Sequence, residues 1–141
     1  MRDSIHNDSY VVAIPPVVVA DNTAQVGAWI DRSGAQSLAF TILTGALADA
    51  DATFAVLVED ADAADQSDHA AVDDAYLLSA TEGTAPETAA AFTHANGNST
   101  RKIGYIGDKQ FVRITITPSA NTGNAALAAV AKLGALSVRP A

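Results

Sequence analysis

The sequence predicts an all-β protein: an antiparallel, jelly-roll-like β-sandwich of about eight strands, preceded by an extended N-terminal arm. In several short segments apolar residues recur at every second position, which is typical of half-buried strands. Residues that favour turns separate these segments. The chain has 141 residues, which suits a single core. We therefore expect an arm over residues 1–23 and one sandwich domain over residues 24–141.

The N-terminal arm is expected to be extended, because Pro15 and Pro16 cannot continue a helix or a central strand. Two placements are open: an edge strand of the chain's own sandwich, or an arm laid over a neighbouring chain. If it reaches a neighbour, removing residues 1–19 should abolish binding and leave a folded domain. The expected contact residues of this arm are Tyr10, Val11, Val12, Ile14, Val17, Val18 and Val19.

Three strands are predicted in the first half of the sandwich, over residues 25–30, 37–44 and 53–59. The turn of residues 31–34 separates the first two. In the third, alternation places Phe54, Val56 and Val58 on one face, which we expect to be buried.

The second half begins with two weaker predicted strands, over residues 75–79 and 89–94. Stronger strands follow over residues 101–107 and 110–117, separated by a short glycine-containing segment. Because glycine adopts positive φ at little cost, this spacing predicts that the two strong strands form a hairpin.

Residues 125–133 fit two structures. The segment is rich in alanine, and Leu127, Val130 and Leu133 recur at helical spacing. As a strand, the segment would place Leu127, Ala129, Ala131 and Leu133 on one face. We expect a strand, because the segment follows a strongly predicted strand and a turn.

The predicted core is thin. Hydrophobic residues make up 49% of the chain, but 31 residues are alanine, whose methyl group contributes little on burial. Part of the stability is therefore expected to come from a partner chain. The chain has no cysteine, which excludes disulfides, thiolate zinc sites and a cysteine nucleophile. No apolar run approaches the length of a membrane span, so no membrane partner is expected.

Charge is segregated along the chain, whose formal net charge is −8. Residues 48–87 carry eleven acidic side chains and no basic one, whereas residues 88–141 carry six basic side chains and one acidic. This acidic balance disfavours nucleic-acid binding. The basic residues Arg101, Lys102 and Arg113 either pair with the acidic segment of the same chain or contact acidic surfaces of neighbouring chains.

No catalytic motif is present in the sequence, and its three histidines are isolated, so neither an enzyme nor a cofactor is expected. The acidic stretch offers one candidate metal site, in which Asp60, Asp62, Asp65 and Asp68 would supply oxygen ligands for calcium. Their spacing lacks the central glycine and the final glutamate of an EF-hand loop. A solvated acidic loop is therefore the preferred interpretation.

Several stretches resemble small virion structural proteins encoded among the head genes of long-tailed bacteriophages. The resemblance lies in residues Asp21–Ala24, Ser37–Phe40, Leu47–Phe54, Val56–Asp60, Val72–Leu78, Arg101–Lys109 and Phe111–Pro118. It implies a β-sandwich that decorates or cements the capsid on the outer surface of the virion. The implied partners are the major capsid protein and copies of the chain itself, arranged as a trimer whose arms bridge neighbouring capsomers. The group carries no established functional residues that could be assigned to this chain.

Two other functions stay open at this point. One is a neck or tail-associated subunit of the virion. The other is an adhesion module on a particle surface, which the predicted sandwich and the acidic loop would suit.

Overall fold

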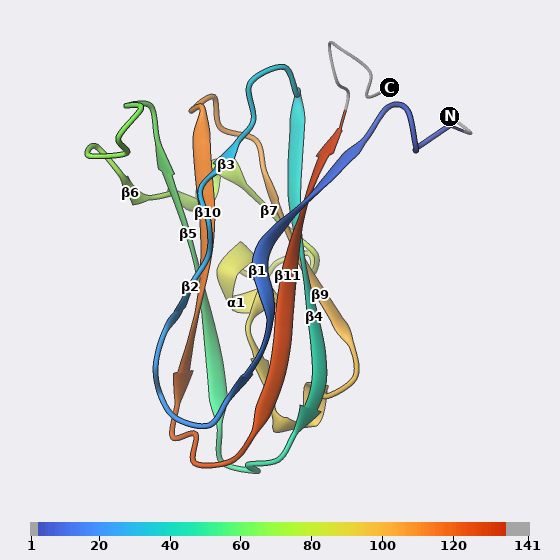
Figure 1. Ribbon diagram of the computed structural model, residues 1–141, viewed down its shortest axis with the longest axis vertical. Helices are drawn as coiled ribbons and strands as arrows, with labels where there is room; N and C mark the ends of the chain where they lie inside the picture. Colours follow the sequence, from blue (N-terminus) through green and yellow to red (C-terminus); the bar gives the residue numbers. More distant parts are fainter. Residues whose placement is uncertain (1–2, 135–141) are drawn as a thin grey trace.

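Two antiparallel β-sheets pack face to face in the computed structural model of the chain, which describes residues 3–134 (Figure 1). Sheet A has five strands in the order β1-β11-β4-β9-β7, and sheet B has the central order β2-β10-β5-β6. In sheet B, β3 also pairs with β10, and β8 also pairs with β5. This architecture confirms the predicted β-sandwich.

The strands differ greatly in length. Sheet A consists of β1 (Ser9–Val19), β11 (Ala125–Gly134), β4 (Ser37–Leu47), β9 (Thr100–Tyr105) and β7 (Leu77–Ser79). Sheet B consists of β2 (Gln25–Val26), β3 (Ile30–Asp31), β10 (Phe111–Ser119), β5 (Thr53–Ala61), β6 (Ala70–Ala71) and β8 (Phe92–Thr93). Residues 3–134 thus contain eleven strands instead of about eight, because four strands of two residues each complete the edges.

The core lies between the inner faces of the two sheets. Phe40 and Ile42 from β4 and Val58 from β5 are fully buried there. Phe54 stacks on Phe92 with 4.7 Å between the ring centroids. The burial pattern of β5 alternates as its sequence predicts, since successive side chains of a strand point to opposite faces.

Residues 125–134 form a strand, as predicted, and not a helix. β11 lies between β1 and β4 and pairs with both. Its inward-facing residues Leu127, Ala129, Ala131 and Leu133 are buried. The backbone pairing and this burial outweigh the helix propensity of its alanines.

The predicted hairpin of residues 101–117 is wrong. β9 pairs with β4 and β7 in sheet A, whereas β10 pairs with β5 in sheet B. The connecting residues 106–110 therefore pass from one sheet to the other. The glycine-containing segment lets the chain turn, as predicted. However, β10 then forms its long antiparallel pairing, over nine residues, with β5 and not with β9.

The two weaker predicted strands and the predicted strand 25–30 need correction. Residues 86–90 form the helix α1 (Pro86–Ala90), which proline starts at its first position. The 3₁₀-helices η1 (Asp74–Tyr76) and η2 (His94–Asn96) replace the ends of two predicted strands. The predicted strand 25–30 divides at Gly27, whose N–H donates to the carbonyl of Ile114. Within residues 3–134, no helix is long and apolar enough to span a bilayer.

The N-terminal segment takes the first of its two open placements. β1 is an edge strand of the chain's own sheet A, and its pairing with β11 has irregularities around the two prolines. It buries Ala13, Ile14 and Val19 in the core. Residues 9–19 are therefore part of the sandwich, which begins before residue 24. The segment stays on its own sheet because its backbone pairs with β11 and its inward side chains are buried in the core.

Candidate functional site

The outer face of sheet A is the candidate site, and the strand register shows which residues share it. Register partners in an antiparallel sheet point to the same side. One row across the five strands runs through Tyr10, Lys132, Ala39, Gly104 and Leu78.

Three further rows complete the face. The second row contains Val12, Val130, Thr41 and Lys102; the third contains Ala128, Leu43 and Thr100; and the fourth contains Val18 and Ala126. The only charged side chains in the four rows are two lysines. The face is therefore apolar, and none of these residues is acidic.

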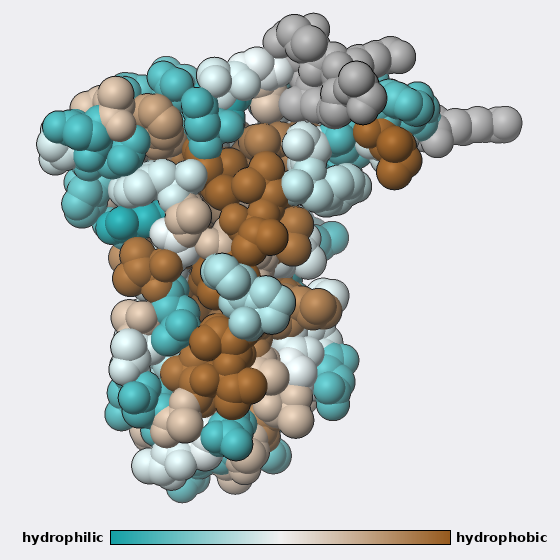
Figure 2. Space-filling view, in the orientation of Figure 1, coloured by the Kyte–Doolittle hydropathy of each residue, from teal (hydrophilic) through white to brown (hydrophobic). Residues whose placement is uncertain are grey.

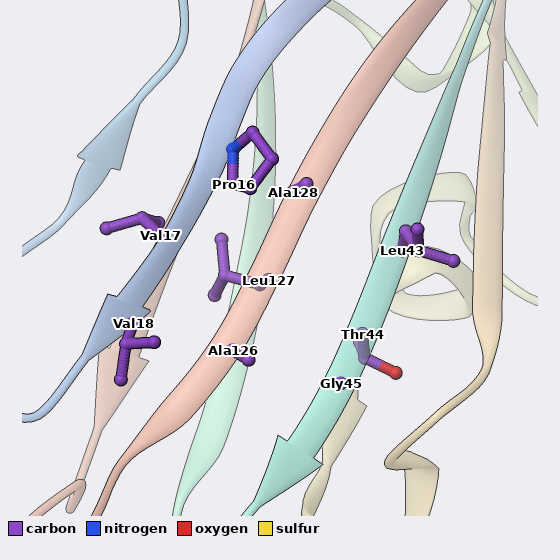
Figure 3. A pocket seen from close by; sticks show the side chains of 9 residues that line it. All are labelled: Pro16, Val17, Val18, Leu43, Thr44, Gly45, Ala126, Leu127 and Ala128. Carbon is purple, nitrogen blue, oxygen red and sulfur yellow. The ribbon is translucent and has the colours of Figure 1, made fainter.

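A groove of about 360 Å³ runs along this face between β1 and β4 (Figure 3). Its floor is β11, and its lining residues are Pro16, Val17, Val18, Leu43, Thr44, Gly45, Ala126, Leu127 and Ala128. The two walls carry exposed apolar side chains, because Val18 is 61% exposed and Leu43 is 55% exposed. The alanines of β11 keep the floor low, and Gly45 adds no side chain to the β4 wall, so that the groove can receive a side chain from another molecule.

This apolar outer face is unusual for an antiparallel sheet, whose solvent side is normally polar. A second hollow continues the same face towards β7, where it is lined by Ala39, Leu78 and Gly104 among others. Hydrophobic surface also follows β1 along the length of the molecule (Figure 2). Contiguous exposed apolar surface of this kind marks an interaction site.

The structure separates the predicted contact residues of the N-terminal segment into two sets. Tyr10, Val12 and Val18 lie on the outer face of sheet A and are more than half exposed. The residues whose register partners face the core are Val11, Ile14, Val17 and Val19. Of these, Ile14 and Val19 are buried and cannot contact another chain in the folded protein.

The three predicted basic contacts do not form one surface. Lys102 is exposed on the outer face of sheet A, whereas its neighbour Arg101 points to the inner side. The guanidinium group of Arg101 donates to the carbonyls of Ala89 and Ala91, at 3.1 and 2.9 Å. Adjacent residues of a strand point to opposite faces, so only Lys102 of this pair belongs to the candidate site.

Arg113 belongs to a separate cluster on sheet B. Its Nε lies 3.0 Å from Oε1 of Glu59, and its guanidinium carbon lies 4.5 Å from the centroid of the Trp29 ring. His69 completes the cluster, with Nδ1 3.1 Å from Oε2 of Glu59. The pairing of Arg113 with the acidic segment of the same chain, one of the two alternatives open from the sequence, is thus confirmed through Glu59. Sequence reasoning missed Trp29 and His69, because they come from segments far from Arg113 in the chain.

The four candidate calcium ligands are engaged separately. Asp60 accepts a hydrogen bond from Tyr105, and Asp62 lies 3.7 Å from Nζ of Lys109. Asp65 and Asp68 accept backbone N–H bonds within their own loop, which lowers the pKa of both carboxyl groups. Within residues 3–134, no three acidic, histidine or cysteine side chains are grouped to hold a metal ion.

Comparisons with known proteins add only distant structural similarity. No protein-family model matches the sequence, and no curated protein matches it. Among solved structures, the chain is similar to one from the crystal structure of the infectious bursal disease virus VP2 subviral particle. The identity is 9% and the TM-score is 0.31, and the match covers 94% of this chain and 41% of the viral chain. With so low a TM-score, this similarity carries no argument about function.

Proposed function

We propose that the chain is a non-enzymatic structural subunit of a virus particle, specifically a capsid decoration protein of a long-tailed bacteriophage. In this role it binds the outer surface of the head and bridges capsid subunits. The observation that carries the proposal is the apolar, groove-bearing outer face of sheet A, which suits contact with another protein chain. The resemblance of its sequence stretches to head-gene products supports the choice of particle.

The exposed side chains of this face suit a modest contact repeated many times. Burying one large aliphatic side chain is worth about 1.5–3 kcal/mol, and the costs of association offset part of that gain. A contact through Val12, Val18 and Leu43 is therefore weak for a single copy. Repetition over a shell multiplies such contacts, since linked sites bind with avidity.

The acidic side of the molecule suits exposure to solvent. The acidic loop between β5 and β6 belongs to sheet B, and its carboxylates form local turns or bonds to residues of the same chain. A negative outer surface would keep a particle that carries many copies soluble.

A binding experiment on purified heads tests this function. Val18→Glu places a charge in the groove, and Val26→Glu is the matched control on sheet B, since the two valines are 61% and 57% exposed. Heads that lack the protein should take up the wild-type chain and the control, but not Val18→Glu. Equal uptake of all three proteins would contradict the proposed role of this face.

The number of copies in each particle separates the two positions in the virion. A decoration protein should be present in numbers close to those of the capsid subunits. A neck or tail ring would contain only a few copies, and quantitative mass spectrometry of purified particles would then replace the proposal with that alternative.

A further inference from the structure

We infer that a pocket at the open edge of β9 binds an oxyanion, that is, a carboxylate or phosphate group. The pocket has a volume of about 240 Å³, and its lining residues are Ala80, Thr81, Ala89, Thr100, Arg101 and Lys102. It shares Thr100 and Lys102 with the outer face of sheet A. It differs from that face because it also includes Arg101, the loop after β7 and α1, so the inference goes beyond the proposed function.

The pocket exists because β7 is shorter than β9. β7 pairs only with residues 103–105 of β9, so residues 100–102 have no strand beside them on this side in the described part of the chain. The chain leaves the sheet after β7 and returns in α1, which contributes Ala89 to the pocket. This end of β9 is therefore open to a ligand.

Several hydrogen-bond donors lie at this open edge. The N–H groups of alternate residues in a strand point to the same edge, and the N–H of Ile106 donates to the carbonyl of Tyr76 on the β7 side. The N–H of Lys102, four residues earlier, therefore points to the pocket side. The hydroxyl groups of Thr81 and Thr100 add two further donors.

Arg101 brings a positive charge to the pocket. Its Nη2 donates to the carbonyls of Ala89 and Ala91, at 3.1 and 2.9 Å, and these bonds hold the guanidinium group in place. Its Nε is buried without a hydrogen-bond partner among residues 3–134, and Nη1 is left to donate to a ligand. Carbonyl groups orient a guanidinium but do not cancel its charge, and a partly buried charge without a counter-ion is unfavourable.

Arg101 and Lys102 differ from the basic residues that are already paired. The described residues form ion pairs of Arg113 with Glu59, Lys109 with Asp62 and Lys132 with Asp8. Neither Arg101 nor Lys102 takes part in such a pair, although the chain has 16 acidic and only 8 basic residues. The pocket therefore has two cationic side chains and no carboxylate in its lining.

An oxyanion suits this set of donors better than a neutral ligand. Hydrogen bonds from a cation to a carboxylate or phosphate oxygen are about twice as strong as those between neutral groups. The volume of the pocket lies below the roughly 300–1,000 Å³ of most small-molecule sites, so it fits one such group and not a large ligand. The group can belong to a free anion or to an acidic side chain of a bound protein.

Titration of the isotope-labelled full-length chain with inorganic phosphate, followed by NMR at pH 7 and constant ionic strength, tests the site. Saturable shifts should appear in the Nε–H signal of Arg101 and in the N–H signals of residues 100–102. Arg101→Met should weaken binding about tenfold or more, because it removes charge-assisted bonds. Lys102→Gln should weaken it about threefold, since a more exposed charge contributes less. Lys109→Gln, which removes a lysine outside the pocket, is the matched control and should bind as the wild type does.

Circular dichroism checks that Arg101→Met is folded, because Arg101 also joins β9 to α1. If that variant unfolds, Lys102→Gln and Thr81→Val, which removes a hydroxyl group from the pocket, decide the test. Shifts that do not saturate, or affinities that are the same in the pocket variants and the control, would overturn the inference.

Binding to heads identifies the source of the oxyanion. If an acidic side chain of a capsid subunit fills the pocket, phosphate should compete with the uptake of the wild-type chain by heads at constant ionic strength. If a free anion fills it, phosphate should bind in the pocket and leave uptake unchanged.

The same measurements keep the two proposals apart. A chain that binds phosphate in the pocket but never binds heads would support the inference and contradict the proposed function. A chain whose binding to heads is lost in Val18→Glu, but which shows no saturable binding of phosphate, would support the proposed function and contradict the inference.

Discussion

Tyr105 links the two sheets at the level of a single residue. It lies on β9 of sheet A, and its hydroxyl donates to Asp60 on β5 of sheet B at 2.8 Å. The same oxygen accepts the N–H of Lys109 at 3.2 Å. Burial and the bond to Asp60 raise the pKa of Tyr105. A Cβ atom at Gly107 would lie 2.4 Å from this hydroxyl, so only glycine lets the crossing segment pass so close.

Replacing this hydroxyl should weaken the sandwich. Tyr105→Phe leaves the Asp60 carboxylate and the Lys109 N–H without their partner, which costs about 1–3 kcal/mol of unfolding free energy. Urea denaturation measures the change. Tyr76→Phe is the control, because Tyr76 is 55% exposed and a surface substitution changes stability by no more than about 0.5 kcal/mol. Equal losses in the two variants would show that the bridging hydroxyl stabilises nothing.

Glu87 on α1 satisfies the edge of β5. Its Oε1 accepts the N–H of Val58 at 2.7 Å, on a stretch of β5 that lies between its pairings with β8 and β6. Burial raises the pKa of Glu87 above its ordinary value, despite this hydrogen bond. The folded state therefore binds its proton more tightly than the unfolded state, and the contribution of Glu87 to stability falls as the pH rises through the folded pKa.

The isosteric Glu87→Gln variant should consequently be more stable than the wild type at pH 7, since its amide oxygen still accepts from Val58 without a buried charge. The advantage should shrink near pH 4, where the wild-type carboxyl is protonated. Thermal melts at the two pH values test this prediction. A variant that is less stable than the wild type at pH 7 would show that the charged hydrogen bond outweighs the burial.

At the scale of elements, β1 connects the core with the candidate site. Its inward residues Ala13, Ile14 and Val19 are buried, while Val12 and Val18 face outward. Its end is fixed to the turn before β11, where Nδ2 of Asn121 donates to the carbonyls of Val19 and Asp21. One strand therefore contributes both to folding and to the proposed contact.

Removal of residues 1–19 should for this reason unfold the domain, and not leave it intact as the sequence alone led us to expect. The deletion exposes β11 and loses the burial of Ile14 and Val19, each worth about 1.5–3 kcal/mol. That loss is comparable with the whole stability of a typical domain. Circular dichroism and limited proteolysis measure the result, and deletion of residues 1–7, which precede the strand, is the control. A cooperative thermal transition in the longer deletion would contradict the role of β1 in the core.

At the scale of the whole molecule, exposed aspartates hold the turns together. Asp49 accepts the N–H and the hydroxyl of Thr122 at 2.8 and 2.9 Å, which joins the turn after β4 to the turn before β11. Backbone hydrogen bonds of this kind lower the pKa of Asp21, Asp31, Asp49, Asp65 and Asp68. The protein should thus lose stability in acid, because protonation weakens the hydrogen bonds of several turns at once.

The sign follows from linkage: a carboxyl group with a lowered folded pKa stabilises the fold above its unfolded pKa, and this contribution is lost as the pH falls below about 4. The melting temperature should fall from pH 6 to pH 3. Asp49→Asn should be less stable than the wild type at pH 7, and the gap should be smaller at pH 3. A gap of the same size at both pH values would show that the charge of Asp49 contributes nothing.

Part of the candidate site could be predicted from the sequence. Tyr10, Val12, Val18 and Lys102 were predicted contacts, and the structure places all four on one face. The outward residues of β11 were missed, although Ala126, Ala128 and Val130 are apolar on the face opposite the buried one. The sequence did carry a signal for these residues, because nearly all side chains of this strand are apolar on both of its faces.

The sequence by itself determined the period of each long strand, because the pleat of a strand forces its side chains to alternate wherever one face is buried. Phe54, Val56 and Val58 share a buried face for this reason. Only the tertiary structure decided which strands pair, that β9 and β10 lie in different sheets, and that Arg101 points inward while Lys102 points outward. These outcomes depend on contacts between residues that are distant in the chain. The local pattern of apolar and polar residues does not determine the energies of such contacts.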